Sequence, residues 1–166
     1  MEILKAAVEW AKAEVFSSRF FILFGVMFVI ATLTFWQMGK TEIAKAFVIP
    51  TLVAGILLMT IGFGIFFANK SRVTSFETAY HHDPSAFVKA EISRTAQSMR
   101  EYRTIVFKVI PFIIIAAALL MVFVDKPNWR AISITTIAMM VVILGVDSNA
   151  NARIETYHEQ LKSVDK

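Results

Sequence analysis

The sequence predicts an all-α integral membrane protein in which four transmembrane helices form an antiparallel bundle with polar helical extensions. The first observation is composition: the 166-residue chain is 57% hydrophobic and only 18% charged, whereas soluble domains average about 25% charged residues. The second is four long apolar runs. The length leaves no room for a second large domain. Cysteine is absent, which excludes disulfides, a thiolate nucleophile and cysteine-based metal sites.

Each apolar run is long enough to cross a bilayer, since a helix needs about 20 residues to span the hydrocarbon. Residues 20–39 and 46–69 contain no charged side chain. Residues 104–124 contain only Lys108, and residues 131–150 contain only Asp147. The first run follows charged residues and is too long for the apolar part of a signal peptide. We therefore expect it to remain in the mature protein as the first span.

Lysine and arginine are distributed unequally around these runs. Of the 17 such residues, 12 lie before the first run, between the second and third, or after the fourth, and Lys108 lies near the start of the third run on the same side. The other four lie in the two short connections. The positive-inside rule therefore predicts cytosolic N- and C-termini in a plasma or inner membrane. Trp36 and Trp129 fall at the opposite ends of spans one and four, where aromatic rings favour the interface.

The polar segments carry apolar residues at helical spacing, so we expect them to extend the spans as continuous helices. Asp83 and Pro84 are typical of an N-cap followed by the first residue of a helix. The segment after span two reads E-T-A-Y-H, and the segment after span four reads E-T-Y-H. We interpret this match as an internal duplication, with residues 1–82 and 83–166 as two hairpin units within one membrane domain. The two units would be related by a pseudo-two-fold axis along the membrane normal.

All three histidines lie in or beside these matched segments, together with acidic residues. In chain order the extensions offer a carboxylate, Glu-x-x-x-His, a carboxylate, and Glu-x-x-His. This order resembles the ligand set of ferritin-like di-iron and di-manganese bundles. The resemblance implies an iron or manganese site in the bundle core, with these ligands: Glu9 (or Glu14), Glu77, His81, Glu91, Glu155 and His158.

One departure from that pattern is the third residue between Glu77 and His81, where the bundles have two. A π-bulge could absorb the extra Ala79. The competing interpretation is that these acids and histidines are solvated faces of cytosolic helices, repeated because the unit was duplicated.

Lys108 and Asp147 each lie 17 residues from an outer turn, at Asp125 and Arg130 respectively. We therefore expect them at similar depth, paired directly or through water as a structural ion pair. The alternative is that Asp147 handles protons or ions, because an acid within a span is a functional candidate by default.

Three functions stay open on this basis, and the sequence does not decide whether the protein is an enzyme. The first is a metal-binding membrane protein that serves redox chemistry, sensing or metal handling. The second is an oligomeric channel lined by threonines. The third is an accessory or scaffold subunit. The expected partners are the lipid bilayer and either further copies of the chain or a membrane complex, but not nucleic acid.

Overall fold

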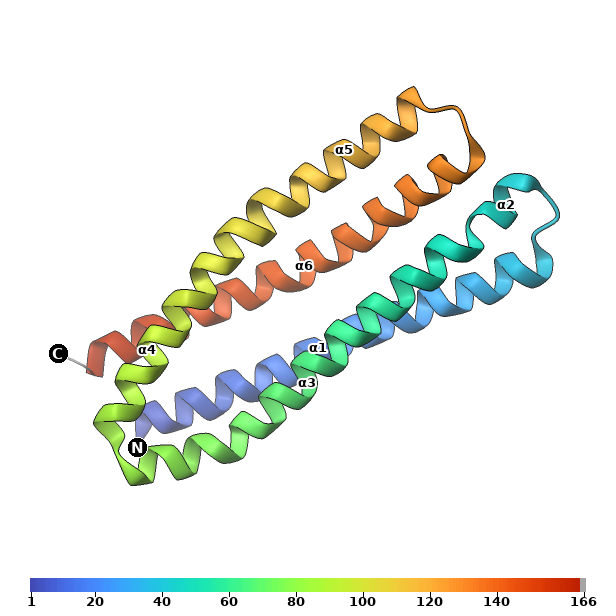
Figure 1. Cartoon of the computed structure of the whole chain (residues 1–166). Helices are drawn as coiled ribbons and strands as arrows, with labels where there is room; N and C mark the ends of the chain where they lie inside the picture. Colours follow the sequence, from blue (N-terminus) through green and yellow to red (C-terminus); the bar gives the residue numbers. More distant parts are fainter. Residues whose placement is uncertain (165–166) are drawn as a thin grey trace.

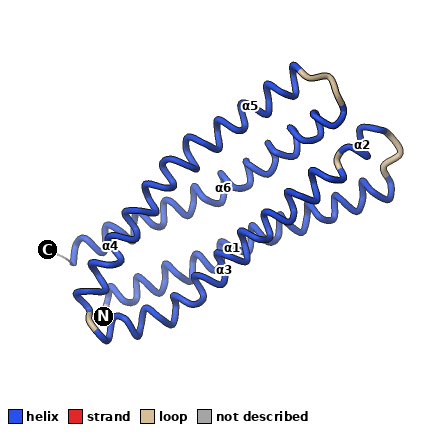
Figure 2. Tube along the Cα trace, viewed as in Figure 1, coloured by secondary structure: helices blue, strands red, loops and turns tan. Residues whose placement is uncertain are grey.

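The computed structural model describes residues 1–164, which are helical except for short turns (Figure 2). The elements are α1 (Glu2–Met38), α2 (Glu42–Ala46), α3 (Val48–His82), α4 (Pro84–Glu101), the π-helix η1 (Tyr102–Val109), α5 (Ile110–Phe123) and α6 (Pro127–Val164). The described residues contain no strand, so the all-α prediction is confirmed.

The helices form two long antiparallel hairpins that lie side by side (Figure 1). The first consists of α1 and α3, and the second consists of α4, η1 and α5 followed by α6. We call the end that holds the N-terminus and the α3–α4 turn the polar end. Four helical segments are long and apolar enough to cross a membrane, namely Glu2–Met38, Glu42–His82, Pro84–Phe123 and Pro127–Val164. The prediction of four helices long and apolar enough to span a membrane therefore agrees with the structure.

Local hydrogen bonds explain where two of these helices begin. The Asp83 carboxylate accepts a hydrogen bond from the Ala86 backbone N–H at 2.9 Å, and proline occupies the first turn of α4. This is the predicted cap, and it satisfies a backbone donor that a helix start leaves without a partner. At the other end of the bundle, the Thr41 hydroxyl accepts from the Ala44 N–H at 3.2 Å and starts α2.

Glycines let α1 and α3 approach closely within the first hairpin. A Cβ built on Gly55 would lie 2.9 Å from the Gly25 carbonyl oxygen and 2.9 Å from a methyl group of Val29. One built on Gly62 would lie 3.0 Å from the Ile22 backbone nitrogen. Since side chains do not tolerate such contacts with backbone, small residues are required here, as in many membrane helix pairs. The two helices of the first hairpin are thus closely packed along this stretch.

The second hairpin is interrupted by η1, where the Ile110 N–H donates to the Ile105 carbonyl five residues earlier. Pro111 follows closely, and in a regular α-helix its ring would clash with the Phe107 carbonyl. The wider π-turn avoids that clash. The π-bulge that the sequence suggested at Ala79 is absent, because α3 remains α-helical to His82. Within the described residues, α5 packs on α6 but does not contact α3.

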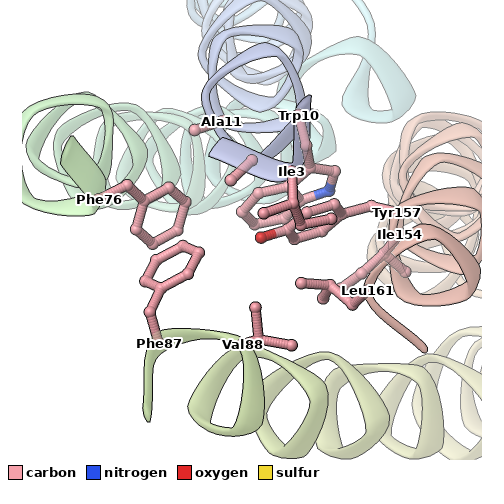
Figure 3. Packing of buried hydrophobic residues seen from close by; sticks show 10 residues of the cluster. Ile3, Trp10, Ala11, Phe76, Phe87, Val88, Ile154, Tyr157 and Leu161 are labelled. Carbon is pink, nitrogen blue, oxygen red and sulfur yellow. The ribbon is translucent and has the colours of Figure 1, made fainter. Parts of the chain in front are cut away.

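A hydrophobic core joins all four helices at the polar end (Figure 3). Trp10 stacks on Tyr157 with ring centroids 5.5 Å apart, and Phe76 meets Phe87 edge-on at 5.4 Å. The other members are Ile3, Ala7, Ala11, Val88, Ile154 and Leu161. This core ties the two hairpins together outside the apolar runs, and it places the neighbouring polar side chains.

Candidate functional site

Four of the six predicted metal ligands lie on outward faces of their helices. Glu77 and His81 are exposed on α3. Glu9 is exposed on α1 and lies 4.0 Å from the Lys5 amine. Glu155 is exposed on α6 and accepts a hydrogen bond from Asn151 at 2.9 Å. These side chains do not point toward a common centre.

The two buried candidates, Glu91 and His158, are bonded to other side chains. Glu91 accepts two hydrogen bonds from Arg94, at 2.8 and 2.6 Å, and a third from the Tyr157 hydroxyl at 3.0 Å. His158 Nδ1 lies 2.7 Å from the Thr95 hydroxyl oxygen. Burial lowers the pKa of His158, which lies outside the apolar runs, and the neighbouring Lys162 lowers it further.

Glu14, the alternative to Glu9, is also buried and forms an ion pair with Arg153, with 3.0 Å between nitrogen and oxygen. Within residues 1–164, no group of three or more His, Asp or Glu side chains is placed to hold a metal ion. The physical reason is rotation: adjacent residues on an α-helix point about 100° apart. Ile154 faces the core, so the next residue, Glu155, faces outward. The structure thus gives the predicted iron or manganese site no support.

Lys108 and Asp147 do not form a direct ion pair in the described structure. Their side chains differ in exposure. Val106 and Ile110 are the buried positions of this stretch, so Lys108, midway between them, is exposed. Asp147 is half-buried and lines a cavity on the inner side of α6.

That cavity has a volume of about 550 Å³ and lies between the two hairpins. Its polar end is lined by Trp10, Arg72 and Arg94, and its apolar end by Ile61, Ile65, Ile105, Val109, Ile113 and Ile143. We call it the lateral cleft. In the described residues α3 contacts neither η1 nor α5, and Figure 1 shows α5 set apart from α3. The cleft therefore runs from the polar core into the apolar runs, along the side where the hairpins separate.

Aromatic and guanidinium groups form the polar end of the cleft. The Arg94 guanidinium lies over the Trp10 ring at 4.5 Å from its centroid, and the Arg72 guanidinium lies at 6.0 Å. Arg94 is already neutralised by Glu91. Arg72 donates to the Asn69 side-chain oxygen at 2.8 Å, and no carboxylate of the described residues forms an ion pair with it. Arg72 is therefore a half-buried cation that forms no ion pair with a carboxylate of the described residues, although the negative charges of Glu91 and Glu14 lie close enough to attract it.

Charges of both signs face the middle of the cleft. Burial raises the pKa of Glu14, which lies outside the apolar runs, while the attraction of Arg153, Arg72 and Arg94 opposes that rise. Burial also raises the pKa of Tyr102, and the negative charges of Glu14 and Asp147 add to it. The Tyr102 hydroxyl therefore stays protonated at physiological pH and can donate a hydrogen bond.

Sequence reasoning did not select Trp10, Arg72, Arg94, Tyr102 or Tyr157. The signal that could have found part of this set is the helical phase of α1. Ile3, Ala7, Trp10 and Glu14 recur at intervals of three and four residues and are all buried, so Glu14, and not Glu9, shares the inward face.

No family model, curated protein or solved structure matches this chain.

Proposed function

We propose that this chain is a membrane protein that binds a phospholipid in the lateral cleft. The observation that carries the proposal is Arg72, a half-buried cation without a carboxylate partner, at the polar end of a cavity whose other end is apolar. A phosphate group would neutralise Arg72, and the acyl chains would lie along the isoleucine-rich wall. The cavity volume of about 550 Å³ falls within the range of roughly 300–1,000 Å³ that is usual for ligand sites.

Headgroup contacts would provide most of the net affinity. A lipid acyl chain that moves from the bilayer into the cleft leaves one apolar environment for another. Burial of the acyl chain alone therefore contributes little to the binding free energy. A charge-assisted hydrogen bond in a partly buried site contributes more. Arg72, with the Trp10 ring beside it, is then the group on which selection for a phospholipid depends.

The other functions considered from the sequence have less support in the geometry. A channel would need polar side chains on a shared face. Thr32 and Thr51 instead lie 2.9 Å apart, oxygen to oxygen, within the α1–α3 interface. The scaffold function rests on no single feature of the described residues.

Tryptophan fluorescence can test lipid binding, because Trp10 lines the cleft and is only 7% exposed. The variant Trp36→Phe with Trp129→Phe retains Trp10 as its only tryptophan. In mixed micelles with phospholipids brominated on the acyl chains near the glycerol, we expect saturable quenching of Trp10. Bulk lipid would not reach a ring that is this buried.

A matched pair of substitutions separates cleft binding from non-specific quenching. Ile65→Phe, at a lining position, should abolish the saturable component by filling the cleft. Ile56→Phe, on the exposed face of the same helix, should leave it unchanged. Quenching that rises linearly with brominated lipid, equally in both variants, would overturn the proposal.

A further inference from the structure

Four hydroxyl-bearing residues line the lateral cleft, namely Ser17, Ser18, Ser98 and Tyr102. Ser18 already donates to the Val15 carbonyl, and the inference concerns Ser17 and Tyr102. Ser17 lies on α1 and Tyr102 lies on η1, so they belong to different walls. We infer that the bound phospholipid carries ester-linked chains, whose carbonyl oxygens accept hydrogen bonds from Ser17 and Tyr102. This inference rests on the proposed phospholipid binding and specifies which chemical class of phospholipid the cleft recognises.

The depth of the two hydroxyls supports this assignment. Arg72 donates to Asn69, which lies three residues earlier on α3, so its guanidinium reaches toward the apolar end of the cleft. Gly62 on α3 packs against Ile22 on α1. Because the two helices are antiparallel, a step of seven residues toward the polar end runs forward along α3 and backward along α1. That step places Asn69 within one helical turn of Ser17. Seven residues before Ile22 is Val15. Ser17 therefore lies two residues, roughly 3 Å, on the apolar side of Asn69 and of the Arg72 guanidinium bonded to it.

Tyr102 approaches the same level from the opposite wall. Side chains of a helix lean toward its N-terminus, and the N-terminus of α4, which continues into η1, is at the polar end. The ring thus leans from the apolar runs toward Glu14. Glu14 is close enough for its negative charge to help raise the pKa of the Tyr102 hydroxyl.

Ester carbonyls occupy this level in a phospholipid, since they lie between the phosphate and the chains. A phosphate at Arg72 would place them beside the two hydroxyls, with the chains continuing along Ile65 and Ile105. Both hydroxyls can donate: serine always carries its proton at physiological pH, and the raised pKa of Tyr102 keeps its proton in place. An ether-linked lipid offers only weak acceptors there and would leave both donors without partners.

A competition experiment distinguishes the two linkages. The variant that retains only Trp10 is first quenched with brominated diester phosphatidylglycerol. It is then titrated with unlabelled phosphatidylglycerol that has either diester or diether chains of equal length. We expect the diester lipid to displace the brominated lipid at roughly tenfold lower mole fraction, as two neutral hydrogen bonds imply.

Substitutions at the hydroxyls identify the cause of that preference. Tyr102→Phe should reduce the ratio between the two lipids by about threefold and leave diether binding unchanged, and Ser17→Ala provides the same test should Tyr102→Phe not fold. Tyr80→Phe, at a half-buried tyrosine outside the cleft, should keep the full ratio.

Equal displacement by both lipids would overturn the ester inference and leave phospholipid binding in place. If no phospholipid quenches Trp10 saturably, the proposed function fails first, and the inference fails with it. The two failures are therefore distinguishable.

Discussion

Removing Arg153 should strand the Glu14 carboxylate inside the polar end of the bundle. Glu14 is 6% exposed, and its ion pair with Arg153 joins α1 to α6. Burial already raises the pKa of Glu14 despite the attraction of Arg153. In Arg153→Gln that attraction is lost, so at pH 7 the folded state must either hold an unpaired anion or bind a proton.

The expected cost at pH 7 is about 3 kcal/mol, the lower end of the range for losing one partner of a buried pair. We take the lower end because the Arg153 side chain is 30% exposed. For a chain of this length the cost corresponds to a decrease in Tm of about 6–12 °C. The sign of the pH effect follows from the raised pKa: the folded state binds a proton more readily than the unfolded state, so lowering the pH toward the pKa should restore stability.

The assay is thermal unfolding in detergent at pH 7 and pH 5, for four proteins. They are the wild type, Arg153→Gln, Glu14→Gln and the double variant. We expect the Arg153→Gln defect to shrink at pH 5 and the double variant to be more stable than Arg153→Gln at pH 7. Additive effects with no pH dependence would refute the reasoning, because they would mean that the two groups do not interact.

Three further predictions test the fold. Gly55→Leu should separate α1 from α3, because even a Cβ there would lie 2.9 Å from the Gly25 carbonyl oxygen. We expect a loss of about 3 kcal/mol, the upper end of the usual range for overpacking, measured by Tm, and an unchanged Tm would contradict the close packing. Lys108→Met and Asp147→Asn should have additive effects on the free energy of unfolding in a double-mutant cycle, since no direct ion pair joins the two residues. A coupling energy above about 0.5 kcal/mol would instead support the predicted ion pair. Reporters fused within residues 84–101 should read cytosolic and a reporter near Pro127 external, as the lysine and arginine counts predict; the reverse pattern would overturn the orientation.

The sequence predicted the four long apolar helices well because their signal is local. Each apolar run has the length of about 20 residues that a membrane-spanning helix requires, and charged residues mark its limits. The Asp83 cap could also be read directly, since an acid before proline satisfies a requirement of the first helical turn alone.

The candidate site was harder to predict because it depends on rotation of the helices about their axes. Spacing of three or four residues places Glu155 near His158 on α6, but a difference of about 60° between such positions is enough to bury one and expose the other. On α1, Val8 and Ala11 flank Glu9 with apolar residues, so the sequence alone did not decide whether Glu9 or Glu14 faces inward. Packing of Trp10 against Tyr157 settles the phase in the structure.

The lateral cleft has no local signal at all. It exists because glycines hold α1 against α3 while α5 packs only on the second hairpin. A cavity of this kind is a property of the separation between two hairpins, which hydrophobic periodicity does not report.

Native mass spectrometry of the protein released from mild detergent measures phospholipid retention most directly. Three proteins should be compared, namely the wild type, Arg72→Gln and the control Lys70→Gln, which removes an exposed charge on the same helix. Loss of a charge-assisted hydrogen bond costs about 1.5–3 kcal/mol, so Arg72→Gln should weaken retention by roughly 10- to 150-fold. We expect one phospholipid per chain in the wild type and in Lys70→Gln, and little or none in Arg72→Gln. Equal retention by all three proteins, or no bound phospholipid in the wild type, would contradict binding in the lateral cleft.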